Sequence, residues 1–311
     1  MHRRPIFILV AALCIAVSVT SAHAQIFDQG PVETREYRNP NLAPPVHDHG
    51  IETENMFGFT LGSDTDEAGG SGVALETVGR FVRRGGHYTA IGGKLEFARG
   101  FADDLSASLS LLGGYRSISV IGNLPNTNRL RFDGVGGEIR WRLLQRGPSP
   151  VGITLHMEPA FRVADEVSGQ GGRGFASENK LIFDTALVPD RVFAAVNLIY
   201  DVEAFRPYGA AGTERASTLG VSGAMSVQVA PMFFLGGEMR YLRAYAGMGL
   251  NTFQGEALFA GPTLFWHATE SAWVSLAFNA QLAGRAVGTR GGFDMDNFDR
   301  YALRFKIGMH F

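Results

Sequence analysis

Apolar and polar side chains alternate over many short stretches of this chain. Between residues 151 and 163, Leu155, Met157 and Phe161 share one parity, and Thr154 and His156 share the other. Successive side chains of a β-strand point to opposite faces, so such a stretch has one apolar face and one polar face. The pattern therefore predicts a chain built of β-strands that separate an apolar from a polar environment.

The predicted strands are separated by breaks that are alternately short and long. The short breaks, rich in Pro, Asp and Ser, lie at residues 100–104, 145–150, 189–190, 230–231 and 268–271. The long breaks, rich in Gly, Asn and Arg, lie at residues 63–86, 117–129, 166–177, 206–214, 247–254 and 285–299. Tight turns at one end and longer loops at the other are typical of transmembrane barrels. We therefore expect an all-β, antiparallel, up-and-down barrel of about twelve strands.

One stretch, residues 73–82, does not fit this count. It can form a strand, but Leu75, Val78 and Val82 also match a helical spacing. Counting it alone as an extra strand would place a long loop at the wrong end. We expect the run 54–60 to open the first strand, and 73–82 to lie in the first external loop, as a strand extension or as an element folded into the pore. A lipid-facing strand here would raise the count to fourteen.

The first 24 residues have the three zones of a secretory signal peptide. Two arginines give a basic start, an apolar run extends from Ile6 to Val19, and small residues lead up to Ala24. The run is shorter than the roughly 20 residues of a spanning helix, so we expect cleavage after Ala24. Cys14, the only cysteine, lies inside this segment. The mature chain is therefore expected to have no thiol.

These boundaries divide the chain into three segments. Residues 1–24 are the expected signal peptide. Residues 25–50 contain four prolines and little apolar periodicity, which predicts a flexible periplasmic leader. Residues 51–311 are expected to form the barrel.

The last residues alternate up to the final position. Tyr301, Leu303, Phe305, Ile307 and Phe311 share one parity, and small or charged residues lie between them. This tail resembles the last strand of bacterial outer-membrane β-barrel proteins of the porin or transporter kind, in which a terminal phenylalanine is read by the assembly machinery. The resemblance implies the outer membrane of a Gram-negative bacterium, with the lipid bilayer, lipopolysaccharide and barrel assembly machinery as partners. Tyr301, Phe305 and Phe311 are the expected C-terminal assembly signal.

Composition narrows the class of protein further. After residue 24 no apolar run is long enough for a spanning helix, and the mean hydropathy is +0.03. A barrel hides its membrane character in this way, because only alternate residues face lipid. The formal net charge of -2 gives no indication of a nucleic-acid partner.

Projecting the alternation inward predicts a charged lumen. Charged side chains are costly on the lipid face, so their restriction to one parity supports this assignment. The pore candidates are Lys94, Glu96, Arg116, Glu138, Arg140, Arg142, His156, Glu158, Arg162, Lys180, Asp184, Asp201, Glu203, Glu238, Arg240, Arg304 and Lys306. They form either a charged, water-filled passage or a structural network of ion pairs. Nine bases against seven acids predict at most a weak preference for anions.

Aromatic residues near the predicted strand ends are expected at the level of the lipid headgroups. Trp273 belongs to this group. Phe193 and Trp266 are instead candidates for side chains that point inward.

The chain lacks the patterns of the known barrel enzymes. In the expected mature chain no serine lies two residues from a histidine, the spacing that outer-membrane phospholipases of the twelve-stranded kind use for an activated nucleophile. Asp294, Asp296 and Asp299 offer hard oxygens for calcium, and His47 and His49 offer two further ligands, but such groups are more often solvated loop or linker. We expect no enzymatic activity, no cofactor and no metal site.

The function most consistent with these features is passage of small solutes across the outer membrane. The alternative is a non-conducting barrel with a structural role, or one whose external loops meet lipopolysaccharide or another partner.

Overall fold

Twelve β-strands make up the computed structural model of this protein, which describes residues 51–122 and 124–311. The strands are β1 (Ser71–Phe81), β2 (His87–Ala102), β3 (Leu105–Ser119), β4 (Thr127–Leu144), β5 (Gly152–Ala164), β6 (Gly171–Val188), β7 (Val192–Pro207), β8 (Glu214–Ala230), β9 (Phe233–Ala246), β10 (Thr252–His267), β11 (Ala272–Ala286) and β12 (Tyr301–His310). Within the described ranges there is no helix with the length and apolarity needed to cross a membrane. The expected signal peptide and leader, with His47 and His49, lie outside the described residues.

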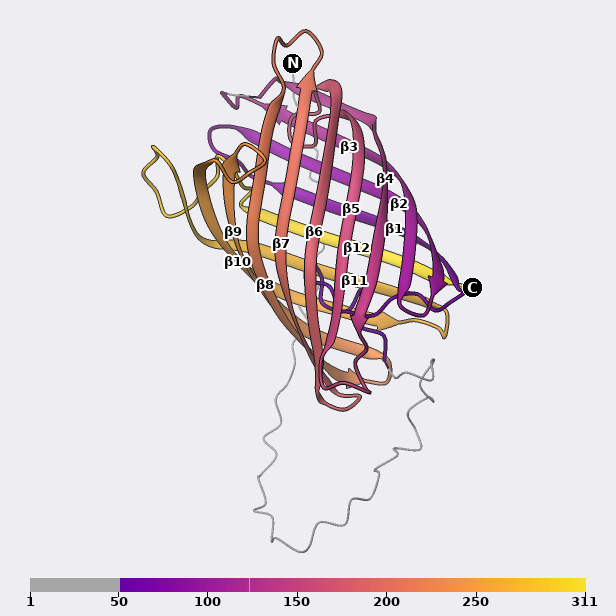
Figure 1. Cartoon of the computed structure of the whole chain (residues 1–311). Helices are drawn as coiled ribbons and strands as arrows, with labels where there is room; N and C mark the ends of the chain where they lie inside the picture. The colour runs from indigo at the N-terminus through magenta and orange to yellow at the C-terminus, as the bar shows by residue number, and fades with distance from the viewer. Residues whose placement is uncertain (1–50, 123) are drawn as a thin grey trace, which may run out of the picture. The chain divides into compact units, whose positions relative to one another are not determined.

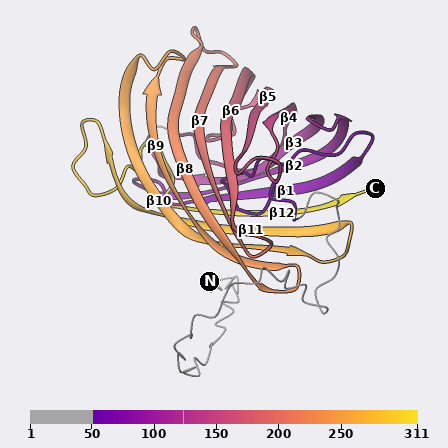
Figure 2. The same ribbon diagram turned by 60° about the horizontal axis from the view of Figure 1, so that its bottom comes forward.

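The strands form one closed antiparallel barrel, as Figures 1 and 2 show. Each strand pairs with its neighbours in sequence, and β1 pairs with β12 from Gly72–His310 to Phe81–Tyr301. Closure leaves no strand edge with unpaired backbone groups, which is the condition for a sheet to lie in hydrocarbon. The predicted fold class and strand number are confirmed.

Short connections gather at one end of the barrel and longer loops at the other. The first group, which we call the turn end, joins β2 to β3, β4 to β5, β6 to β7, β8 to β9 and β10 to β11. The second, the loop end, joins the remaining pairs, and its β11–β12 loop spans residues 287–300. The five predicted short turns and five of the six predicted long loops are therefore found where the sequence placed them.

The beginning of the barrel differs from the prediction. Residues 73–82 lie almost entirely in β1, and Leu75 on this strand points outward. The count nevertheless stays at twelve, because residues 54–60 do not form a strand. The assignment of 73–82 to an external loop was thus wrong, as was the expectation that a strand there would give fourteen. The run 54–60 lies inside the barrel instead.

The outer wall is apolar and the inner wall is polar, as the alternation predicts. On β3, Leu109 and Leu111 are exposed, whereas Ser110 and Arg116 are buried. The tryptophans near the β10–β11 turn reverse their expected positions: Trp266 is 45% exposed on the outer wall, and Trp273 is 3% exposed inside. Trp273 is buried because it packs on the inner aromatic cluster described next.

Candidate functional site

The candidate functional site is the lumen of the barrel. A segment of the chain fills one half of it, and a cavity occupies the other half. Residues 51–66, which we call the plug, fill the half of the lumen near the turn end. The half near the loop end contains an open cavity, which we call the vestibule.

An aromatic cluster holds the plug at the turn end. Met56 and Phe57 of the plug are fully buried and belong to one hydrophobic cluster with Phe193, Phe234 and Trp273. These three wall residues lie close to the turn-end limits of β7, β9 and β11. Phe193 points inward as predicted, and it packs on the plug.

Asp184 on β6 is a polar anchor for two separate parts of the plug. Its carboxylate accepts hydrogen bonds from the Ser63 backbone nitrogen at 3.1 Å and from the Ser63 hydroxyl at 2.5 Å. It also accepts one from the Thr53 hydroxyl. Arg146, in the β4–β5 turn, forms an ion pair with Asp184 at 2.5 Å and with Asp64 of the plug at 2.8 Å. The plug is therefore tied to β6 and to a turn at once.

Glu238 on β9 and Asn197 on β7 form hydrogen bonds with the backbone groups in the middle of the plug. The Glu238 carboxylate accepts hydrogen bonds from the nitrogens of Phe59 at 3.2 Å and Thr60 at 2.9 Å. The Asn197 amide pairs with both the nitrogen and the oxygen of Leu61, at 2.8 and 2.9 Å. Buried backbone groups outside a sheet need such partners, and here inward-facing side chains provide them.

Three bases on β4 and β12 complete the set of anchors. Arg140 donates to the Gly62 oxygen at 2.6 Å, and Lys306 donates to the Asn55 side chain at 2.9 Å. Arg304 donates to the carbonyl oxygen of Gly58. The plug is thus held from β4, β6, β7, β9 and β12, so it crosses the lumen from wall to wall.

Two plug carboxyl groups have opposite shifts in pKa. Burial raises the pKa of Glu52 to about 7, although His310 at 3.7 Å opposes this shift. Burial would also raise the pKa of Asp64, but the ion pair with Arg146 and the hydrogen bonds from Thr53 outweigh it and leave this pKa below its ordinary value. Glu52 is therefore expected to change charge near neutral pH while the plug is docked.

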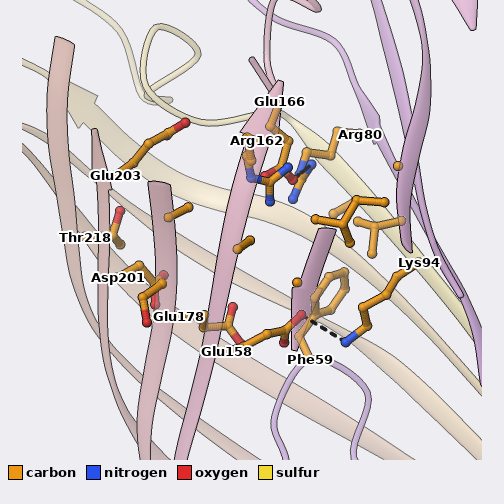
Figure 3. A pocket seen from close by; sticks show the side chains of 18 of the residues that line it. Phe59, Arg80, Lys94, Glu158, Arg162, Glu166, Glu178, Asp201, Glu203 and Thr218 are labelled. Atoms are coloured by element: carbon orange, nitrogen blue, oxygen red, sulfur yellow. Dashed lines mark hydrogen bonds and ion pairs between the residues drawn. The ribbon is translucent and has the colours of Figure 1, made fainter. Parts of the chain in front are cut away.

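The vestibule is a cavity of about 430 Å³ on the loop side of the plug. The ring of Phe59 belongs to its lining, and the guanidinium of Arg240 lies over this ring at 4.0 Å from its centre. Figure 3 shows Arg80 and Arg162 beside Glu166 near the top of this space. The plug thus forms the floor of the vestibule.

Most charged side chains of the vestibule are paired. Lys94 lies 2.9 Å from Glu96 and 2.9 Å from Glu158. Arg162 lies 2.8 Å from Glu166, which Arg80 also contacts. The two arginines hold the pKa of Glu166 well below its ordinary value, so this loop-end carboxyl is ionised at neutral pH.

One wall of the vestibule concentrates carboxylates. Glu158 on β5 lies opposite Glu178 on β6, and Glu178 lies opposite Asp201 on β7. Like charges directly opposite each other on neighbouring strands are unfavourable. Glu178 is paired with Lys180 at 2.5 Å. Among the described residues, Asp201 and Glu203 form no ion pair, and each has a buried carboxylate oxygen without a hydrogen-bond partner.

All the sequence-predicted pore candidates lie on the inward parity of their strands. Six of them form hydrogen bonds with the plug, and these are Arg140, Lys180, Asp184, Glu238, Arg304 and Lys306. Arg142 contacts Asp64 at 4.0 Å, and Arg116 is paired with Asp133 at 2.6 Å. His156 is buried between Glu138 and Glu158. Whether these residues line a path for solutes stays a prediction.

Some lumen residues escaped the sequence analysis. Glu76 and Arg80 were missed because β1 was assigned to a loop, although their alternation with Leu75 was the available signal. Glu178 was missed although it directly follows the predicted loop at 166–177 and has the same parity as Lys180. The inward position of Arg146, in a turn, has no periodic signal at all.

The aspartates of the β11–β12 loop are engaged within the protein. Asp294 is buried and accepts hydrogen bonds from Asn297, at 3.0 Å from its backbone nitrogen. Asp296 pairs with Arg84 at 2.7 Å, and Asp299 pairs with Arg83 at 2.6 Å. The ion pairs of Asp296 and Asp299 tie this loop to the β1–β2 loop.

The C-terminal aromatic residues lie on or beside the outer wall. Phe305 and Phe311 are exposed, and the Phe311 ring lies 6.5 Å from that of Phe97. Tyr301 is half-buried and stacks on Phe278 at 6.0 Å. Their role as an assembly signal stays a prediction.

Comparison with known proteins identifies a sequence family and a common fold. The sequence model of DUF6662, a family of unknown function, matches residues 49–311. No curated protein sequence matches the chain. Among solved structures, the COG4313 outer membrane channel from Pseudomonas putida F1 is similar with a TM-score of 0.53 and 12% identity, covering 80% of this chain and 98% of that one. The translocator domain of the autotransporter NalP from Neisseria meningitidis gives a TM-score of 0.46 at 14% identity, covering 80% and 91%. At such identities the likeness concerns the fold, which this chain shares with barrels of the outer membrane.

Proposed function

This chain belongs to the DUF6662 family, and from the geometry of its lumen we propose that it is an outer-membrane channel for small solutes, closed in this conformation by the plug. In this proposal the loop end faces the exterior and the turn end faces the periplasm, as in other outer-membrane barrels. A solute enters the vestibule from outside, and it passes when the plug moves aside.

The vestibule carries this proposal. A barrel that served only as a scaffold would be expected to fill its lumen with packed side chains, yet a cavity of about 430 Å³ remains above Phe59. Charged and polar side chains surround this space, and several of them have spare hydrogen-bonding capacity. Such a lining suits a small polar solute better than an apolar one.

The way in which the plug is held supports its role as a gate. Within the described residues, no backbone-to-backbone hydrogen bond joins residues 51–66 to a strand. The barrel closes through β1 and β12, and both lie outside the plug. The plug can therefore leave its place by exchanging side-chain hydrogen bonds for water, without any break in the sheet.

Pairing alters the expected ion preference. Counting charges favours anions weakly, but most bases of the vestibule are neutralised by a neighbouring carboxylate. Asp201 and Glu203 lack such a partner, and among the bases of the vestibule Arg240 lies against the Phe59 ring, which leaves its charge in place. We therefore infer a modest preference for cations or for solutes that carry an amine.

A disulfide latch between plug and wall provides the test. A Cβ atom built on Gly152 would lie 3.0 Å from the Cβ of Ser63 and 2.5 Å from Oδ1 of Asp184, so a disulfide can form here when the plug and this carboxylate shift outward. The expected mature chain contains no other cysteine, so the Ser63→Cys/Gly152→Cys pair can be oxidised selectively. In planar bilayers we expect channel openings of the parent protein, none for the oxidised pair, and openings again after reduction. Ser63→Cys alone is the matched control, and its channel openings should be the same under oxidising and reducing conditions.

The same bilayers give the ion preference. At alkaline pH, where Glu203 is ionised, the reversal potential in a salt gradient should indicate cations, and Glu203→Gln should reduce this preference without changing how often the channel opens. A reversal potential that indicates anions would contradict the inference that the vestibule carboxylates set the ion preference.

A non-conducting barrel is the second candidate, and the density of plug anchors favours it. Asp184 and Glu238 each bind the plug through several hydrogen bonds, and a permanent seal requires such contacts. Under this alternative, neither the reduced latch nor Glu238→Ala would conduct. The vestibule would then be a binding surface for a partner or for lipopolysaccharide at the loop end.

A further inference from the structure

His156 lies in an unusual place for a histidine. It is on the inner wall of β5 and its side chain is fully buried, but neither ring nitrogen has a hydrogen-bond partner in the described part of the chain. Buried polar groups are nearly always satisfied, and an exception calls for an unseen water or ion. The two ring nitrogens therefore remain available to a water molecule or an ion.

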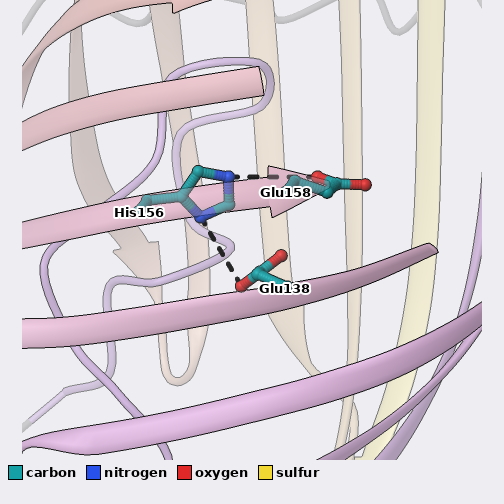
Figure 4. Close-up of side chains that lie close together, drawn as sticks. All are labelled: Glu138, His156 and Glu158. Atoms are coloured by element: carbon teal, nitrogen blue, oxygen red, sulfur yellow. Dashed lines mark ion pairs between the residues drawn. The ribbon is translucent and has the colours of Figure 1, made fainter. Parts of the chain in front are cut away.

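Carboxylates surround this ring on both sides. The Nδ1 atom lies 3.6 Å from Oε1 of Glu138, and the Nε2 atom lies 3.9 Å from Oε2 of Glu158 and 3.9 Å from Oε1 of Glu178. Figure 4 shows Glu138 and Glu158 at the two nitrogens of the ring. These separations are too long for hydrogen bonds, which end near 3.2 Å. They are close to the distance of about 3.4 Å between two ligands of one tetrahedral zinc ion.

The geometry points to a site for a divalent transition-metal cation of the zinc type, with His156 and Glu158 as ligands and Glu138 as the carboxylate that orients the ring. One ligand atom from each of these residues lies within 4.8 Å of the other two. Imidazole and carboxylate are a donor set that zinc and its neighbours in the first transition row accept. This inference does not depend on conduction, because a plugged barrel can hold the ion equally well.

The two ring nitrogens suggest different roles for the two carboxylates. A cation at Nε2 takes Oε2 of Glu158, which is free because Lys94 lies at the other oxygen, 2.9 Å from Oε1. The Nδ1–H group then points to Glu138, which orients the ring in the way that carboxylates commonly support metal-binding histidines. Oε1 of Glu178 also lies 3.9 Å from Nε2, but it is paired with Lys180 at 2.5 Å, so Glu178 is not counted among the ligands.

The vestibule gives the ion a route to this site. Glu158 and Glu178 line the cavity, while His156 lies behind them in the wall. Positions around the cation that the protein leaves open would face the vestibule, where water or a solute carboxylate can coordinate. Catalytic zinc sites are open in the same sense, whereas structural sites are closed by four protein ligands.

Metal titration of the full mature chain in detergent, after treatment with a chelator, tests the inference. We expect Co²⁺ to give visible d–d absorption with one equivalent bound, and Zn²⁺ to displace it. His156→Ala should abolish this signal. Glu138→Gln should weaken binding by about 10- to 100-fold, as loss of an orienting carboxylate does.

Two control variants separate the site from general effects. His87→Ala removes an exposed histidine of the loop end, and Glu203→Gln removes another vestibule carboxylate; both should bind Co²⁺ like the parent. The shift of the folded band on unheated gels verifies that each variant has formed its barrel, and Glu138→Gln remains informative if His156→Ala does not fold. Absence of saturable binding, or equal binding by His156→Ala, would overturn the site. Channel openings without metal binding would refute this inference while leaving the proposed function intact.

Discussion

At the scale of single residues, docking of the plug depends on one close approach between backbone and wall. Gly58 has a φ of +84°, a left-handed conformation that residues with a side chain rarely adopt. A Cβ atom there would lie 2.6 Å from the Cβ of Ala277 and 2.9 Å from Oε1 of Glu238. The plug can cross in front of β11 and β9 only because this position has no side chain.

Gly58→Ala is therefore expected to loosen the plug. Overpacking of this kind costs about 1–3 kcal/mol, so hydrogen exchange of the plug amides should accelerate by roughly tenfold or more. Gly69 is the matched control, because its φ is +82° and a Cβ there would meet no atom within 4 Å. Gly69→Ala has the backbone strain without the overlap. Equal exchange rates in the two variants would refute the role given to the close approach.

At the scale of elements, the plug is a segment held by side chains, and its docking is expected to depend on pH. Burial raises the pKa of Glu52 from 4.5 to about 7. Between these two pH values the docked plug therefore holds a proton that the released plug has lost. A raised acid stabilises the docked state fully below its released pKa, and this contribution is lost as pH rises through the docked pKa. The groups that face Glu52 are His310 of β12 and the plug carboxyls Glu54, Asp64 and Asp66.

We expect the plug to be released more readily at pH 8 than at pH 5. Protease cleavage of residues 51–66 in detergent micelles, at protease levels corrected for pH, measures this release. Glu52→Gln should flatten the dependence between pH 4.5 and 7, and any remainder belongs to His310 and the other carboxyls. Faster cleavage of the parent protein at the lower pH would mean that protonation of Glu52 does not stabilise the docked plug.

At the scale of the whole molecule, the outer wall sets the position of the barrel in a bilayer. Leu109 of β3 is 76% exposed and pairs with Phe97 and Gly137, well inside their strands. Leu130 of β4 is 77% exposed and lies near the loop end, opposite Tyr115. The two leucines are thus equally exposed but differ in their expected depth.

Leu109→Arg should destabilise the folded protein in lipid vesicles by about 2–4 kcal/mol, and Leu130→Arg by only about 0–1 kcal/mol. The difference arises because an arginine at mid-membrane has to leave water, whereas one near the interface does not. Urea unfolding followed by tryptophan fluorescence measures both. Similar losses would mean that the hydrocarbon layer does not lie across the middle of the barrel.

Much of the barrel could be predicted from the sequence because its determinants are local. A strand that faces lipid on one side and water on the other must alternate, so Leu155 and His156 reveal their faces without knowledge of any partner. Turn length reveals the end of the barrel at which each connection lies. The assignment failed at β1, where Leu75 and Val78 fit two periodicities and only pairing with β12 decides between them.

The plug and the candidate metal site could not be predicted in this way. Residues 54–60 alternate like a strand, but they lie inside the lumen, where Glu238, about 180 residues further on, accepts hydrogen bonds from the backbone nitrogens of Phe59 and Thr60. Alternation places Glu138 and His156 on the inner wall, but it does not tell which inward side chains meet. That depends on strand register, which is a property of the closed sheet. The sequence by itself determined which side of the wall each residue faces, because this depends only on parity along one strand. Only the tertiary structure decided which residues touch across the lumen, because those contacts join strands that are distant in the chain.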